Sequence, residues 1–171
     1  TYSSIHEILR VQYFSLAIIE TDITQHRIQQ RMNNDHVTFG FVCVQNAGRS
    51  QMSAAFAERE RQRRGLEDEV EIITGGTHPA DEVHPEVVDV MKELDIDLSG
   101  HVPQEVSTAI LNECDVVLTM GCSTLELDAS VEVRDWALDD PHGQDIDRVR
   151  EIRGEVKGRV TDLFDEFFGD E

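Results

Sequence analysis

The sequence predicts an α/β domain with a parallel sheet flanked by helices. Short runs rich in valine, isoleucine and phenylalanine alternate with longer stretches in which apolar residues recur every three or four positions. Strands that alternate with helices form parallel sheets, because each helix carries the chain back to the same end of the sheet. The chain has 171 residues, of which 39% are hydrophobic, so one domain can bury a sizeable core.

The apolar pattern places the elements in order along the chain. Strands are predicted at residues 37–42, 70–73, 116–120 and 131–136. Helices are predicted at residues 50–64, 85–94, 103–112 and 146–167. The pair Gly75-Gly76 is expected to end the second strand. In the third helix, we expect Val106, Ile110 and Leu111 to face the core.

The loop between the first strand and the first helix holds a cysteine, Cys43, and an arginine, Arg49. Such a loop directs several backbone N–H groups into one concavity at a helix N-terminus, which favours an anion. Arg49 can add a bidentate fork to a tetrahedral oxyanion, and the same positive field would stabilise a thiolate nucleophile at Cys43. Gly48 would permit backbone conformations that other residues resist. The alternative is that Cys43 is an inert buried thiol at a strand end.

Ser50 follows this loop and has two possible roles. Its hydroxyl could donate a hydrogen bond to the Cys43 sulfur, it could cap the first helix, or it could do both.

Ligands of open parallel sheets bind beyond the carboxyl ends of the strands, where the loops after the strands meet. The four loops in question are residues 43–49, 75–78, 121–122 and 139–141. They would bring a second thiol, Cys122, and a carboxylate pair, Asp139 and Asp140, to the pocket of Cys43 and Arg49.

Composition excludes several classes of partner. The net charge of −20 argues against non-specific binding to nucleic acid and to anionic membranes. Only two of the 15 basic residues are lysines, a composition that resembles proteins of salt-loving organisms. Three cysteines do not suggest a disulfide framework, and no apolar run reaches the ~20 residues of a membrane span, so we expect a cytoplasmic location. The histidines lack paired metal-ligand spacing, so neither a metal nor a cofactor is expected.

Four blocks resemble the low-molecular-weight protein tyrosine phosphatase superfamily, which includes a branch of arsenate reductases. They are VCVQNAGRSQM, VHPEVVDVMKELDIDLSGH, DVVLTMGC and WALDDPHG, and the resemblance covers residues 37–168. It implies a four-stranded parallel sheet of order 2-1-3-4 in a three-layer fold. We therefore predict a phosphatase- or reductase-like domain at residues 32–171. Residues 1–31 hold equal numbers of acidic and basic residues, and we predict that they form an N-terminal appendage.

The resemblance also implies roles for residues at matching positions. Cys43 would be the nucleophile and Asp140 the general acid, with Asp139 as the adjacent competitor. Asn46 would brace the loop and Ser50 would support the thiolate. The oxyanion would be bound by Val44, Gln45, Asn46, Ala47, Gly48, Arg49 and Ser50.

Fewer residues indicate whether the chain resembles the arsenate reductases or the phosphatases of this superfamily. Gln51, which follows Arg49 and Ser50, looks like the reductases, and Cys122 follows the third strand where thioredoxin-coupled reductases place a resolving cysteine. Residues 123–128 hold no further cysteine, and Cys114 is expected to be structural. An alanine, Ala54, replaces an acidic ligand of the potassium site in some reductases, so no such site is expected.

The main prediction is a thiol-dependent arsenate reductase, with thioredoxin, glutaredoxin or a small thiol as reductant. The alternative is a phosphatase that hydrolyses phosphomonoesters through a phosphocysteine. A third possibility is a non-enzymatic anion-binding protein.

Overall fold

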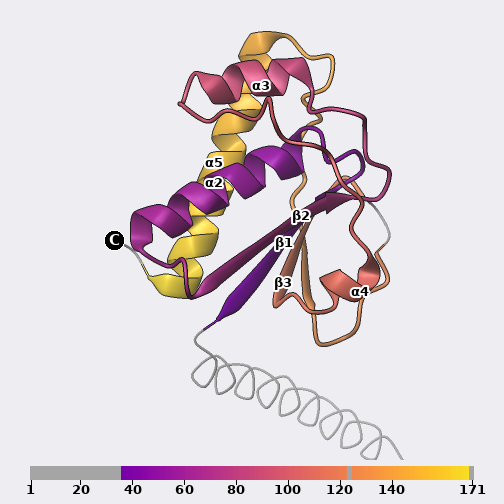
Figure 1. Cartoon of the computed structure of the whole chain (residues 1–171), viewed down its shortest axis with the longest axis vertical. Coiled ribbons are helices and arrows are strands. Elements are labelled where there is room, and N and C mark those ends of the chain that lie inside the picture. Colours follow the sequence, from indigo (N-terminus) through magenta and orange to yellow (C-terminus); the bar gives the residue numbers. More distant parts are fainter. Residues whose placement is uncertain (1–35, 123–124, 170–171) are drawn as a thin grey trace, which may run out of the picture. The chain divides into compact units, whose positions relative to one another are not determined.

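A four-stranded parallel sheet forms the centre of the protein. The structure is a computed structural model that describes residues 36–122 and 125–169. The strands are β1 (Val37–Cys43), β2 (Val70–Gly76), β3 (Val116–Met120) and β4 (Glu132–Asp135). They run parallel in the order β2-β1-β3-β4, which confirms the predicted sheet (Figure 1).

Helices cover both faces of this sheet, as Figure 1 shows. They are α2 (Arg49–Arg64), α3 (Pro85–Lys92), α4 (Thr108–Leu111) and α5 (Ile146–Phe168). The helices α2, α3 and α5 lie on one face and the short α4 lies on the other, so the fold has three layers (Figure 1).

The core has two clusters because successive side chains of a strand point to opposite faces of the sheet. Phe39, Phe41 and Cys43 of β1 belong to the larger cluster, which α2, α3 and α5 cover. Val42, between them, belongs to a smaller cluster together with residues of α4 and β3. The long helix α5 packs its apolar stripe into the larger cluster through Val149, Ile152, Val156, Val160, Leu163 and Phe164.

The predicted helix at residues 103–112 is wrong over most of its length. Helical structure is confined to Thr108–Leu111, and Ile110, expected to face the core, is 44% exposed. The preceding residues are extended because they bond the end of β2: Gly76 N–H donates to the Gln104 carbonyl and Val106 N–H donates to the Gly76 carbonyl. These long-range bonds replace the bonds of a helix.

The Gly75-Gly76 pair continues β2 instead of ending it. Both glycines are needed because other chain segments approach closely. A Cβ at Gly75 would lie 2.4 Å from the Cβ of Val106, and one at Gly76 would lie 2.6 Å from the Val44 carbonyl oxygen. The pair therefore allows the loop after β1 to pack directly against the end of β2.

The predicted appendage at residues 1–31 lies outside the described residues. Within the part of the chain that the structure describes, no helix is long and apolar enough to cross a membrane.

Candidate active site

Cys43 is the last residue of β1, and its thiol is buried where the sheet meets α2. Only 3% of the residue is exposed. Its sulfur lies 2.9 Å from the Ser50 hydroxyl and accepts a hydrogen bond of 3.1 Å from the backbone N–H of Asn46. The sulfur therefore has two polar neighbours although it belongs to the larger core cluster.

Asn46 holds the 43–49 loop in shape. Its φ of 50° is in the left-handed region, which asparagine tolerates better than most residues. The side-chain amide donates to Ser50 Oγ at 2.8 Å and to Thr74 Oγ1 at 2.9 Å. Its oxygen accepts from Gln51 Nε2 and from the Gln104 backbone, both at 3.1 Å. Because Ser50 Oγ accepts from Asn46, its own O–H is free to donate to Cys43.

Four carbonyls of the 43–49 loop accept hydrogen bonds from the segment after β2. Those of Cys43, Val44, Gln45 and Ala47 accept hydrogen bonds from the backbone N–H groups of residues 77, 78, 80 and 84, at 2.8–3.2 Å. In a planar trans peptide, each carbonyl points opposite to the N–H of the next residue. Several loop amides are thus directed toward the side of the loop that does not face the 77–84 segment, as the bond from Asn46 N–H to the sulfur illustrates.

The start of α2 shows whether Ser50 caps this helix. The helix begins at Arg49, its N-cap is Gly48, and no side chain caps it, so the capping role is wrong and the sulfur contact remains. Gly48 has a negative φ of −139°. Its small size matters because a Cβ there would lie 2.8 Å from Cγ of Pro141.

Arg49 joins this loop to the loop at residues 138–143. Its Nη1 donates to the Leu138 carbonyl at 2.9 Å, and its Nη2 lies 3.2 Å from Asp140 Oδ2. The Arg49 side chain is 11% exposed, whereas that of Asp140 is 57% exposed. Asp139 instead faces α5, where it pairs with Arg148 at 2.5 Å. Of the two carboxylates, Asp140 is the one that contacts Arg49.

Cys122 follows β3, as predicted, but its side chain belongs to a different core cluster from that of Cys43. Gly121, with a φ of +76°, turns the chain immediately after the strand. The Cys122 thiol then enters the smaller core cluster and donates to the Val42 carbonyl at 3.5 Å. Cys43 belongs to the larger cluster, so the two thiols pack in different parts of the core. Burial raises the pKa of Cys122, which favours the thiol over the thiolate.

Cys114 also belongs to the smaller cluster, where its sulfur lies 3.1 Å from the position of a Cβ at Gly40. Burial and the neighbouring Asp115 raise its pKa to about 11. A protonated thiol in close packing fits the predicted structural role.

Sequence reasoning missed a group of side chains beside the 138–143 loop. The rings of His84 and His142 stack with their centroids 4.1 Å apart, and His84 Nε2 bonds Gln45 Oε1 at 3.1 Å. Burial and the adjacent His142 lower the pKa of His84. The sequence offered one signal for this group, the histidine directly after Asp140-Pro141, but not its partner.

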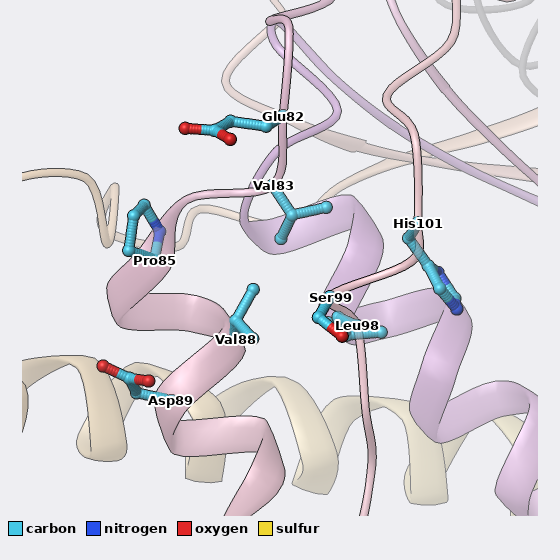
Figure 2. A pocket seen from close by; sticks show the side chains of 8 residues that line it. All are labelled: Glu82, Val83, Pro85, Val88, Asp89, Leu98, Ser99 and His101. Carbon is cyan, nitrogen blue, oxygen red and sulfur yellow. The ribbon is translucent and has the colours of Figure 1, made fainter.

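A pocket opens beside α3, next to His101 (Figure 2). Its lining residues are Glu82, Val83, Pro85, Val88, Asp89, Leu98, Ser99 and His101. His101 Nδ1 also bonds Gln51 Oε1 at 3.2 Å, so the pocket borders the side chains that support Asn46. Among residues 36–122 and 125–169, no group of three or more His, Cys, Asp or Glu side chains is placed to hold a metal ion.

The sheet is parallel, with Cys43 at the end of its first strand and Arg49 at the start of the next helix. Comparisons with known proteins identify the family that shares this fold. The family model described as low molecular weight phosphotyrosine protein phosphatase matches residues 38–170. A curated protein of Halobacterium salinarum, named "Putative arsenate reductase", is 69% identical over 142 residues, which are 82% of this chain and 100% of that protein. The chain belongs to the low-molecular-weight phosphotyrosine protein phosphatase family, and it is an enzyme.

Two further relatives carry names that specify a reductase. A glutaredoxin arsenate reductase of Synechocystis is 33% identical over 127 residues, covering 72% of this chain and 92% of its own. A solved structure titled as an arsenate reductase in the phosphate binding state superposes with a TM-score of 0.65 at 29% identity, covering 77% of this chain and 98% of its own. The acidic composition and the relative from Halobacterium agree with a halophilic protein.

Proposed function

We propose that this chain is a thiol-dependent arsenate reductase in which Cys43 is the nucleophile. The observation that carries the proposal is the environment of the Cys43 sulfur, which accepts a hydrogen bond from Asn46 N–H and lies beside the Ser50 hydroxyl. Donors that face a sulfur stabilise its thiolate form, the form that attacks. The reductase names among the relatives favour arsenate over a phosphoester as the electrophile.

The loop that follows Cys43 would bind the oxyanion. The carbonyls of residues 43, 44, 45 and 47 are occupied by the 77–84 segment, which leaves the opposite amides of Val44, Gln45 and Gly48 for an anion at the N-terminus of α2. Arg49 lies at the same helix end and would supply the planar fork that a tetrahedral oxyanion accepts.

In the first step, the Cys43 thiolate would attack arsenic(V), and a sulfur–arsenic bond would form as an arsenic–oxygen bond breaks. The leaving oxygen needs a proton to depart as water. We propose that Asp140 provides it, a role supported by its contact with Arg49, whereas Asp139 is paired with Arg148.

In the second step, a thiol would attack the Cys43 sulfur of the adduct. The electron pair of the sulfur–arsenic bond then stays on arsenic, which leaves as arsenite, and the two thiols are oxidised to one disulfide. We propose Cys122 as that thiol. A disulfide needs the two Cα atoms within about 7 Å, and the Cys122 side chain must leave the smaller cluster, so the segment after β3 would have to shift.

A thiol reductant must then restore the enzyme, because the two electrons that reduced arsenic came from the two thiols, which are left oxidised as a disulfide. Thioredoxin, glutaredoxin or a small thiol could supply them. A small thiol could also replace Cys122 in the second step.

The second candidate function is phosphomonoester hydrolysis through a phosphocysteine. It is favoured by the position of Cys122 in a separate cluster, since hydrolysis needs no second thiol. The same Cys43, Arg49 and Asp140 would serve it, with water in place of the resolving thiol.

A paired assay in high salt tests the proposal. Arsenate reduction is measured with thioredoxin, glutaredoxin and small-thiol systems, and p-nitrophenyl phosphate hydrolysis is measured on the same preparation. The proposal expects arsenate turnover with at least one reductant. Robust hydrolysis without arsenate turnover under any reductant would favour the phosphatase and reject the reductase.

A further inference from the structure

We propose that Glu86, together with the stacked pair His84 and His142, is a brace that positions Asp140 over the 43–49 loop. None of the three would touch the substrate. The inference deepens the proposed function, because it rests on Asp140 as the acid.

The first contact of the brace fixes the turn after Asp140. Glu86, in the first turn of α3, accepts a hydrogen bond of 2.8 Å from the backbone N–H of Gly143. Gly143 has a φ of +72°, so the chain turns sharply at this residue. Burial raises the pKa of Glu86, but the hydrogen bond from Gly143 and the nearby histidines outweigh burial and lower this pKa. The Glu86 carboxylate therefore stays ionised as an acceptor.

The second contact connects the histidines to the Asp140 carboxylate. The backbone N–H of His142 donates to Asp140 Oδ1 at 3.0 Å, while Arg49 approaches the other oxygen. The His142 ring stacks on His84, and its Nδ1 lies 3.4 Å from Glu86 Oε1. A displacement of the His142 ring would therefore carry with it the amide that orients Asp140.

The third contact connects the brace to the loop that holds the nucleophile. His84 N–H donates to the Ala47 carbonyl at 2.9 Å, and His84 Nε2 donates to Gln45 Oε1. His84 is 8% exposed and directly precedes α3, so it is a rigid anchor. The start of α3 thus contacts both loops, and this shared support sets the distance between the acid and the sulfur.

Matched variants separate a positioning role from a general effect on stability. Glu86→Ala removes the acceptor for Gly143, whereas Glu86→Gln keeps an oxygen that can accept the same bond. Asp89→Ala, an exposed carboxylate further along α3 on the rim of the pocket in Figure 2, is the control. His142→Ala removes the stack, and His142→Phe retains an aromatic ring.

Three kinds of measurement are made on the full chain in high salt. They are kcat and KM for arsenate, the affinity for inorganic phosphate, and hydrogen exchange of the His142 and Gly143 amides. We expect Glu86→Ala and His142→Ala to lower kcat by ~10–100-fold, the range for a small misplacement of a reacting group. Phosphate affinity should not fall, and both amides should exchange faster. Glu86→Gln and His142→Phe should recover most of kcat, and Asp89→Ala should match the wild type.

The brace is rejected if the amides exchange faster without loss of kcat, or if Asp89→Ala loses as much activity as Glu86→Ala. A loss of phosphate affinity parallel to kcat would also reject it, because that pattern reports damage to the 43–49 loop. If the wild type hydrolyses p-nitrophenyl phosphate but reduces no arsenate, the reductase proposal fails while the same comparison of kcat still decides on the brace. A wild type with neither activity would overturn both.

Discussion

The guanidinium of Arg49 lies 3.2 Å from the carboxylate of Asp140 and donates to the Leu138 carbonyl two residues before it. One side chain at the start of α2 therefore holds the loop that carries the proposed acid. An oxyanion on the 43–49 loop would compete for the same guanidinium, so anion binding and the position of Asp140 are coupled through Arg49.

Arg49→Lys should be nearly as damaging as complete loss of the side chain. An ammonium cannot form two parallel hydrogen bonds, and it cannot bond Leu138 and Asp140 at once in the geometry of the fork. We expect a large fall in kcat/KM for arsenate and weaker phosphate binding by calorimetry. An unchanged kcat/KM would show that Arg49 does not contact the anion.

Asp140→Asn should slow turnover by ~10²–10⁴-fold, the range for the loss of a positioned acid. One limb of the profile of kcat against pH should flatten. The matched control is Asp139→Asn, whose carboxylate faces Arg148 on α5 and not Arg49. If the Asp139 variant shows the larger loss, the acid is assigned to the wrong neighbour.

Gly48→Ala should push the 43–49 loop and the 138–143 loop apart. The added Cβ would lie 2.8 Å from Cγ of Pro141, so one of the loops must move. We expect a destabilisation of about 1–3 kcal/mol, typical of overpacking, together with a lower kcat.

Gly154→Ala, within α5, is the control for that variant because a Cβ there meets no atom within 4 Å. It should instead stabilise the protein by about 0.5–1 kcal/mol through helix propensity. Thermal unfolding compares the two variants, and equal effects of both would contradict the contact with Pro141.

His84 makes stability depend on pH in a defined direction. Burial and the adjacent His142 lower its pKa from 6.5, so below pH 6.5 the unfolded chain binds a proton that the folded chain resists. The contribution of neutral His84 to the free energy of unfolding is complete above pH 6.5, and it is lost as the pH falls through the lowered pKa. Thermal unfolding between pH 8 and pH 5 should show a smaller decline for His84→Gln than for the wild type. Identical slopes would mean that His84 does not titrate in this way.

The strands and long helices could be predicted because their signals are local. Continuous apolar runs mark β1 and β3, and a regular stripe marks α5. The helix predicted at residues 103–112 failed because the bonds of Gln104 and Val106 to Gly76 connect distant parts of the chain. No local pattern indicates them.

In the candidate site, too, local contacts could be predicted and long-range contacts could not. Cys43, Asn46 and Ser50 lie within eight residues, so their proximity follows from a strand, a loop and a helix in sequence. The stack of His84 on His142 depends on how separate loops meet, and so does the packing of Cys122 and Cys43 in different clusters. Those contacts are set by tertiary packing and could not be read from spacing.

A single-turnover experiment tests the central claim most directly. Fully reduced protein is mixed with arsenate in high salt without external thiol. Arsenite is quantified, and the chain is alkylated and analysed by mass spectrometry. We predict stoichiometric arsenite, a disulfide between Cys43 and Cys122, and a free Cys114. Cys43→Ser should form no arsenite while still binding phosphate, and Cys122→Ser should form arsenite only when a small thiol is added. Wild-type protein that yields no arsenite, even with added thiol, and retains three free thiols would contradict the account.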